Sequence, residues 1–175
     1  MVNMENITKE DIIKHFELLP LPGEGGYFRQ NYCAKEQFLR SVLPGHYNQD
    51  QKPYSTAIFY FLTDEPDCFS ELHRLPTDEI FHFYLGDPME TLLLYPDHNS
   101  RRVIIGQNFL QNQHLQFVVP AGVWQGSRVL PGGRFSLIGT TMAPGYNDAD
   151  YEKGEWAVLS SAYPQEAELI RILTR

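Results

Sequence analysis

Residues 70–86 place a histidine and a glutamate on either side of a predicted tight turn. The stretch reads SELHRLPTDEIFHFYLG, and the turn residues 76–78 separate two runs that are typical of strands. If both strands present these side chains to the inside of a barrel, His73 and Glu79 meet in an apolar cavity. An imidazole beside a carboxylate can accept or donate a proton near neutral pH, as general acid–base catalysis requires. The alternative role is a structural pair that satisfies hydrogen bonds inside the barrel.

The alternation of side chains along a strand predicts which neighbours share that cavity. On the first strand it groups Glu71 with His73, and on the second strand it leaves His82 on the outer face. The walls of the cavity are therefore expected to be apolar and to come from Phe69, Leu75, Phe81 and Phe83.

Four further residues are candidates for ligand binding. Gln125 is expected in the same cavity, where its amide could bind a carbonyl or hydroxyl group or hydrogen-bond to a strand backbone. Arg29 lies on a strand near the predicted mouth, and a guanidinium can hold phosphate or carboxylate through two parallel hydrogen bonds. Its alternative role is an ion pair at a surface or interface. Trp124 and Tyr27 could stack on a sugar or base, although aromatic residues on such strands also form core or dimer contacts.

The elements that position these residues are mostly strands. A helix is expected to begin after Thr8, because Ile12, Ile13, Phe16 and Leu19 recur at helical spacing. The remaining pattern predicts a loop over 40–53, a short helix over 164–173, and strands over 27–33, 54–63, 68–75, 79–85, 89–96, 102–106, 114–120, 123–130 and 134–144. Short strands that follow one another with turn signals and no helices between them predict an all-β antiparallel sandwich or barrel.

Length and composition are those of one folded domain. We expect a single domain over 1–175, with a helix and arm over 1–53, a barrel core over 54–145 and a tail over 146–175. The net charge of −8 argues against nucleic acid or an anionic membrane as a partner, because both require a basic surface. The two cysteines form no C-x-x-C pair, and the N-terminus carries acids where a secretory leader is apolar. These features predict a cytoplasmic protein.

Two spacings in the chain resemble the motifs of the cupin superfamily. His73-x-Leu75-x3-Glu79-x6-Gly86 is similar to the first cupin motif, with Leu75 at the position of that motif's second histidine and Asp67 at its opening glycine. Pro120-x-Gly122-x2-Gln125 is similar to the middle of the second motif, with Gln125 at the ligand histidine, His114 at the opening glycine and Val129 at the final asparagine.

From about residue 18 onward, the chain resembles the small cupins called cupin family 5, a domain of unknown function. That resemblance implies an antiparallel jelly-roll barrel, and it implies His73, Glu79 and Gln125 at three of the four usual ligand positions. His73 and Glu79 alone are too few for a tight transition-metal site, so we expect no metal and no other cofactor. A divergent metal enzyme is one alternative.

We therefore expect a barrel that binds a small polar metabolite, such as a sugar or nucleotide derivative. The activity expected is a metal-independent epimerase or isomerase that uses His73 and Glu79, since some related cupins are sugar-nucleotide epimerases. A non-catalytic binding or interaction module is the other alternative. A homodimer is also expected, because the runs AIFYFL and IFHFYL carry apolar side chains on both faces and sheet edges must be covered.

Overall fold

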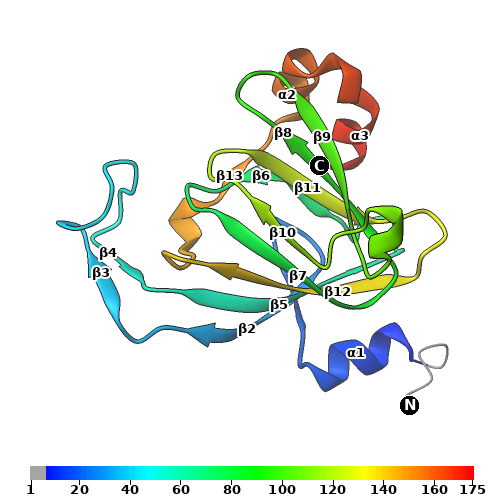
Figure 1. Cartoon of the computed structure of the whole chain (residues 1–175), viewed down its shortest axis with the longest axis horizontal. Coiled ribbons are helices and arrows are strands. Elements are labelled where there is room, and N and C mark those ends of the chain that lie inside the picture. Colours follow the sequence, from blue (N-terminus) through cyan, green and yellow to red (C-terminus); the bar gives the residue numbers. More distant parts are fainter. Residues whose placement is uncertain (1–6) are drawn as a thin grey trace.

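The computed structural model describes residues 7–175 as two facing antiparallel sheets with helices packed on their outer sides (Figure 1). The first six residues, on which part of the expectation for the N-terminus rests, lie outside this part of the chain. One sheet has the order β1 (Leu19–Pro20), β2 (Tyr27–Cys33), β5 (Thr56–Thr63), β12 (Phe135–Met142), β7 (Glu79–Gly86) and β10 (Gln116–Val119). The other has the order β13 (Glu152–Lys153), β6 (Ser70–Arg74), β11 (Trp124–Val129), β8 (Met89–Leu94) and β9 (Ser100–Ile105).

The main hydrophobic core lies between the two sheets. Phe81 and Phe83 of β7 pack there with Leu93 of β8 and Ile138 of β12, all of them buried. Side chains from alternate positions of both sheets interdigitate in this way in sandwiches and jelly-rolls. The predicted all-β antiparallel jelly-roll is therefore confirmed, and each of the nine predicted strands is present.

The predicted N-terminal helix is present as α1 (Lys9–His15). Thr8 caps it, because its hydroxyl accepts a hydrogen bond from the Asp11 backbone while the Asp11 carboxylate accepts one from the Thr8 backbone. Ile12 is the buried residue of the helix, and it packs against Phe61 and Leu137 on the outer face of the first sheet. Leu19, which the helical spacing included, instead begins β1 and is exposed.

The C-terminal region holds one more helix than predicted. α2 (Trp156–Ala162) precedes the expected segment, which itself forms a 3₁₀ turn η4 (Pro164–Glu166) and α3 (Ala167–Ile172). Two further 3₁₀ turns are η2 (Phe109–Gln111) and η3 (Asp148–Asp150). The helices α2 and α3 cover the outer face of the second sheet, where Leu159, Leu169 and Ile170 pack against Leu72 and Leu92. None of the helices in residues 7–175 is long and apolar enough to cross a membrane.

The predicted loop over 40–53 is partly wrong, because its last residues pair with a preceding strand. β3 (Gln37–Leu39) and β4 (Gln51–Pro53) form a separate hairpin that extends away from the barrel at the left of Figure 1. Polar residues hid this strand from the pattern, because Lys52 is polar and yet fully buried. Its ammonium group forms an ion pair with the buried carboxylate of Asp150, which connects the hairpin to the C-terminal part of the chain.

A bulge in β6 changes which of its side chains face the inside of the barrel. Gln125 of β11 pairs with His73, whereas Ser127, two residues later, pairs with Ser70, so three steps on β6 oppose two on β11. The extra residue reverses the alternation between these positions. Ser70 therefore faces inward together with His73, and Phe69 packs on the outer face with the C-terminal helices. The expectations that Phe69 forms a cavity wall and that Glu71 faces the same way as His73 are wrong for this reason.

Candidate active site

A cavity of about 580 Å³ opens at one end of the space between the sheets. His73 of β6 and Glu79 of β7 both line it, as the sequence predicted. Leu75 and Phe81 supply apolar wall as expected, whereas Phe83 lies deeper in the core. The other lining residues are Leu19, Leu21, Glu24, Phe28, Arg29, Gln30, Thr56, Ile58, Tyr60, Ser70, Thr140, Met142, Tyr146 and Asp148.

The ring of His73 is held in one orientation by three neighbours. Its Nδ1 lies 2.7 Å from the backbone oxygen of Glu71, and a carbonyl oxygen can only accept, so Nδ1 carries the hydrogen. The ring also stacks on Tyr151, with 5.0 Å between the ring centroids. In the neutral imidazole, Nε2 is therefore the unprotonated nitrogen, and it lies 3.4 Å from Nε2 of Gln125. This nitrogen is available as a base.

Glu79 lies on the facing sheet, with its carboxyl group in a buried position. Burial raises the pKa of this carboxyl above its ordinary value, and the negative charge of Glu24 raises it as well. The nearby His73 lowers the pKa, and so do hydrogen bonds from Thr140 and Gln125, but burial has the largest effect. Glu79 is therefore biased toward the protonated form, in which it can donate a proton.

Gln125 of β11 joins the two residues. Its Nε2 donates to Oε2 of Glu79 at 2.7 Å and is also close to the unprotonated nitrogen of His73. The side chain is only 2% exposed, and its Oε1 has no hydrogen-bond partner among the described residues. The amide thus bridges the two side chains.

The raised pKa of Glu79 has a consequence for stability. Because the folded-state pKa lies above the ordinary value of 4.5, the unfolded chain ionises first as the pH rises, and ionisation then favours unfolding. Glu79→Gln is therefore expected to raise the melting temperature relative to wild type at pH values above the pKa of an ordinary glutamate. Each kcal/mol gained corresponds to roughly 2–4 °C for a chain of this size.

Thermal unfolding of both proteins across the acidic and neutral range measures this effect. The difference in melting temperature should be small near pH 4 and should grow toward neutrality. The same difference at every pH would contradict the raised pKa of Glu79.

The structure places the other predicted ligand residues in three different environments. Arg29 lines the mouth of the cavity, where it is half exposed and its guanidinium lies 2.7 Å from the carboxylate of Glu17. Trp124 lies on the opposite face of β11 from Gln125, against the C-terminal helices, with the Arg74 guanidinium 4.7 Å from its ring. Tyr27 lines a different pocket and packs near Phe61. Of the four residues, only Gln125 contacts His73 and Glu79. It is not itself among the residues that line the cavity, so the expectation that its amide faces the cavity is not met.

Sequence reasoning missed most of the polar residues of the cavity, namely Glu24, Gln30, Thr56, Tyr60, Ser70, Thr140, Tyr146 and Asp148. Alternation along β5 could have identified Tyr60, because it shares the inward face with Ile58 and Leu62. Glu24 lies in the glycine-rich loop over 22–26, which the sequence marks only as the end of the helix. Nothing local in the sequence indicates that this loop folds back over the cavity.

The donor set of this site does not fit a transition metal. Among residues 7–175, no group of three or more histidine, cysteine, aspartate or glutamate side chains is arranged to hold a metal ion. Leu75 cannot be a ligand, and the amide of Gln125 is a weak neutral donor that is already used between His73 and Glu79. The chemistry of the site is therefore derived from its protein side chains alone.

Comparisons with known proteins identify a family that this chain matches. The family model described as "Cupin superfamily (DUF985)" matches residues 10–154. An uncharacterized protein of Saccharomyces cerevisiae is 28% identical over 160 residues, which cover 86% of this chain and 78% of that protein. The solved structure of a hypothetical protein from Leishmania major superimposes with a TM-score of 0.84 at 28% identity, over 96% of this chain and 99% of that one.

More distant similarity extends to an enzyme with a longer chain. Oxalate decarboxylase of Bacillus subtilis, in a structure whose description names Mn(II) centres, matches with a TM-score of 0.51 at 15% identity. The match covers 90% of this chain and 38% of the decarboxylase. At this identity the likeness concerns the fold alone.

Proposed function

This chain belongs to the cupin superfamily, in its DUF985 family, and from the cavity of its barrel we propose that it binds a small polar metabolite and transfers a proton on it without a metal. The observation that carries the proposal is the pair His73 and Glu79, which line an open cavity and are bridged by Gln125. A base and an acid that lie close together in a concave site are the usual components of acid–base catalysis.

The chemistry that suits this pair is proton transfer at a carbon next to a carbonyl group. His73 Nε2 takes the proton from that carbon, and the electron pair of the C–H bond becomes the double bond of an enol. The carbonyl oxygen takes the proton of the neutral Glu79 carboxyl. His73 then delivers its proton to the former carbonyl carbon. The hydroxyl group on the carbon that was first deprotonated gives its proton to Glu79 and becomes the new carbonyl group. The product is an isomer of the starting sugar or hydroxycarbonyl compound. No oxidant or reductant is needed.

The test is solvent exchange in D₂O. Purified protein is incubated with aldoses, ketoses and sugar nucleotides, and NMR follows the loss of the proton signal next to each carbonyl group. We expect exchange well above the protein-free rate for at least one compound. Binding without exchange would support a binding protein and contradict the catalytic proposal. Absence of both would contradict the binding proposal as well.

We also propose that the chain forms a homodimer. The apolar outer face of β5 does not itself require a second chain, because α1 covers Phe61 there. Other apolar surface remains exposed, including Tyr84 at 50% and Val118 at 45% on neighbouring strands. In addition, β1 pairs only with residues 27–28 of β2. Beyond them, among the described residues, the outer edge of β2 has no strand partner, and a second copy can pair with such an edge around a two-fold axis.

Light scattering at micromolar concentration is expected to give the mass of two chains, and Tyr84→Glu is expected to shift the protein toward one chain. Glu10→Gln, on the exposed side of α1, serves as a control. A monomeric wild type would contradict the dimer.

A further inference from the structure

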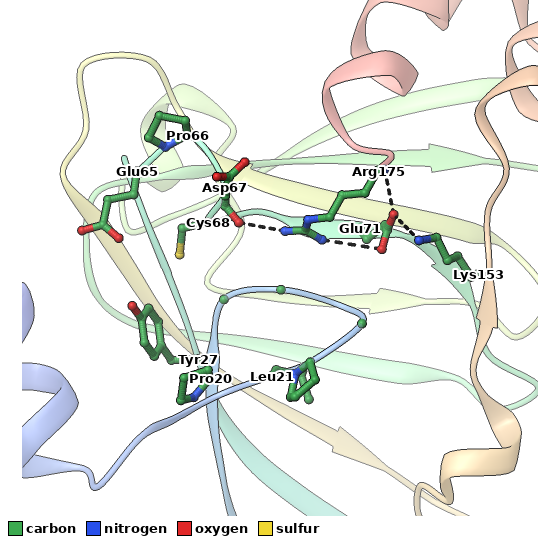
Figure 2. A pocket seen from close by; sticks show the side chains of 14 residues that line it. Pro20, Leu21, Tyr27, Glu65, Pro66, Asp67, Cys68, Glu71, Lys153 and Arg175 are labelled. Atoms are coloured by element: carbon green, nitrogen blue, oxygen red, sulfur yellow. Dashed lines mark hydrogen bonds and ion pairs between the residues drawn. The ribbon is translucent and has the colours of Figure 1, made fainter.

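The loop that carries Glu24 is fixed over the cavity by contacts on its far side. The backbone carbonyl of Glu24 accepts hydrogen bonds from the Glu71 backbone at 2.8 Å and from the Arg175 guanidinium at 3.2 Å. Figure 2 shows Arg175 reaching from the end of the chain to the Asp67 carbonyl and Glu71, with Lys153 on the other side of Glu71. Gly25 has a φ of +99°, and a Cβ there would lie 2.3 Å from the Phe69 carbonyl, so the turn requires glycine.

These contacts leave the Glu24 carboxylate directed to the cavity. One of its oxygens accepts a hydrogen bond from the Ser70 hydroxyl at 3.1 Å, and both residues line the cavity with His73 and Glu79. Leu21, directly before this loop, lines this cavity and also the neighbouring pocket of about 490 Å³ that Figure 2 shows. The loop is thus a wall whose position does not depend on a ligand.

The carboxyl groups that line the cavity belong to Glu24, Asp148 and Glu79, and burial biases the last of these toward its neutral form. The guanidinium of Arg29 lies at the mouth and is paired with Glu17 outside the cavity. Burial raises the pKa of Tyr60 and of Glu79, and the charge of Glu24 raises both further, as expected where negative groups share a poorly solvated space.

Two hydrogen-bond donors of the cavity wall are used within the protein, since Tyr60 donates to the Gly25 carbonyl and Ser70 donates to Glu24. Just beside the wall, the Gln125 amide nitrogen donates to Glu79. A ligand that complements the Glu24 carboxylate must bring a donor and positive charge.

We propose that the ligand of the cavity is a polyhydroxylated amine and that the Glu24 carboxylate binds its ammonium group. The inference rests on the proposed binding function and narrows its substrate class. Hydroxyl groups would hydrogen-bond to the polar side chains of the wall, such as Gln30, Thr56 and Thr140, and the ammonium would neutralise the carboxylate that the loop holds in place. Anionic sugars such as hexose phosphates would meet repulsion from the same carboxylates.

Binding is measured by isothermal titration with three matched sets, each comprising a hexosamine, the parent hexose and the hexose phosphate, built on glucose, mannose and galactose. At least one hexosamine is expected to bind more tightly than its hexose, and no hexose phosphate is expected to bind more tightly than its hexose. Glu24→Gln keeps the size of the side chain and its acceptor for Ser70. It should weaken binding of that hexosamine by about 10–100-fold, typical for loss of a charged hydrogen bond, and leave the hexose unchanged.

Asp67→Asn is the matched control. Asp67 lies outside the cavity, in the neighbouring pocket on the far side of the loop that carries Glu24, and the substitution removes a negative charge there. It should leave hexosamine binding unchanged. Tighter binding of hexose phosphates, no preference for any amine, no binding by any of the nine compounds, or a preference that survives Glu24→Gln would each overturn the inference. If hexoses exchange deuterium without any amine preference, the inference fails while the proposed proton transfer stands.

Discussion

Replacing His73 by Asn is expected to lower the rate of deuterium exchange into a responsive sugar by at least about 100-fold, the usual contribution of a general base. Asparagine can still donate to the Glu71 carbonyl, as Nδ1 of His73 does, but it has no nitrogen that can take a proton. Glu79→Gln should cause a loss of similar size, because the amide cannot deliver a proton to the carbonyl oxygen. Binding of the sugar should change much less than the rate, since both variants keep the shape of the cavity.

His82→Asn is the matched control for this experiment. His82 lies on the outer face of β7, where it contacts Gln116 and Thr141 outside the cavity. Its replacement removes an imidazole from the same strand as Glu79 and should leave exchange at the wild-type rate. If His73→Asn and Glu79→Gln both exchange as fast as wild type, the pair is structural and the proposed mechanism is wrong.

Lys52→Met is expected to destabilise the protein by about 3–5 kcal/mol, the cost of leaving a buried charge without its partner. Lys52 and Asp150 both have fully buried side chains, and they form an ion pair. Asp150 also accepts hydrogen bonds from Gln49 and from the Asn147 backbone, at 2.9 Å each. These would hold the carboxylate in place after the substitution, so its charge would remain buried. Unfolding in urea, followed by circular dichroism, measures the loss.

The exposed pair at α1 provides a comparison within the same chain. Lys9 forms ion pairs at 3.0 Å with Asp64 and Glu65 at the surface, and Lys9→Met should cost no more than about 1 kcal/mol. Adding Asp150→Asn to Lys52→Met should recover part of the stability, because the uncompensated charge is then removed. If Lys52→Met costs as little as Lys9→Met, the buried pair does not anchor the hairpin.

The strands and their order along the chain could be predicted because turn residues and alternating apolar positions are local signals. Alternation also placed Glu79 and Phe81 on one face of their strand, and the resemblance to the cupin motif indicated that this face is the inner one. The environment of Phe69 could not be predicted, since the bulge in β6 arises from its pairing with β11, fifty residues later in the chain. Alternation assumes a regular strand, and one extra residue reverses it.

The remaining parts of the candidate site depend on contacts that no local pattern records. Glu24 reaches the cavity because its loop is held by Glu71 and by Arg175, which lies 151 residues away in the chain. Lys52 looked like a loop residue because its partner, Asp150, is 98 residues away. Sequence reasoning therefore located the pair His73 and Glu79, whose members are six positions apart, and missed the long-range contacts that complete the cavity around it.

Because of the bulge, each of the five residues of β6 lies in a different environment. Ser70 holds Glu24, Glu71 receives the end of the chain, and Leu72 packs under the C-terminal helices. His73 faces the cavity, and Arg74 pairs with Glu152 at the surface. For genetics, this segment is a compact target, because neighbouring codons differ in the kind of defect they can produce. Under the proposed function, changes at Ser70 and His73 would alter ligand preference and catalysis, whereas changes at Glu71 and Leu72 would loosen the C-terminus and weaken the core, and a change at Arg74 would be nearly silent.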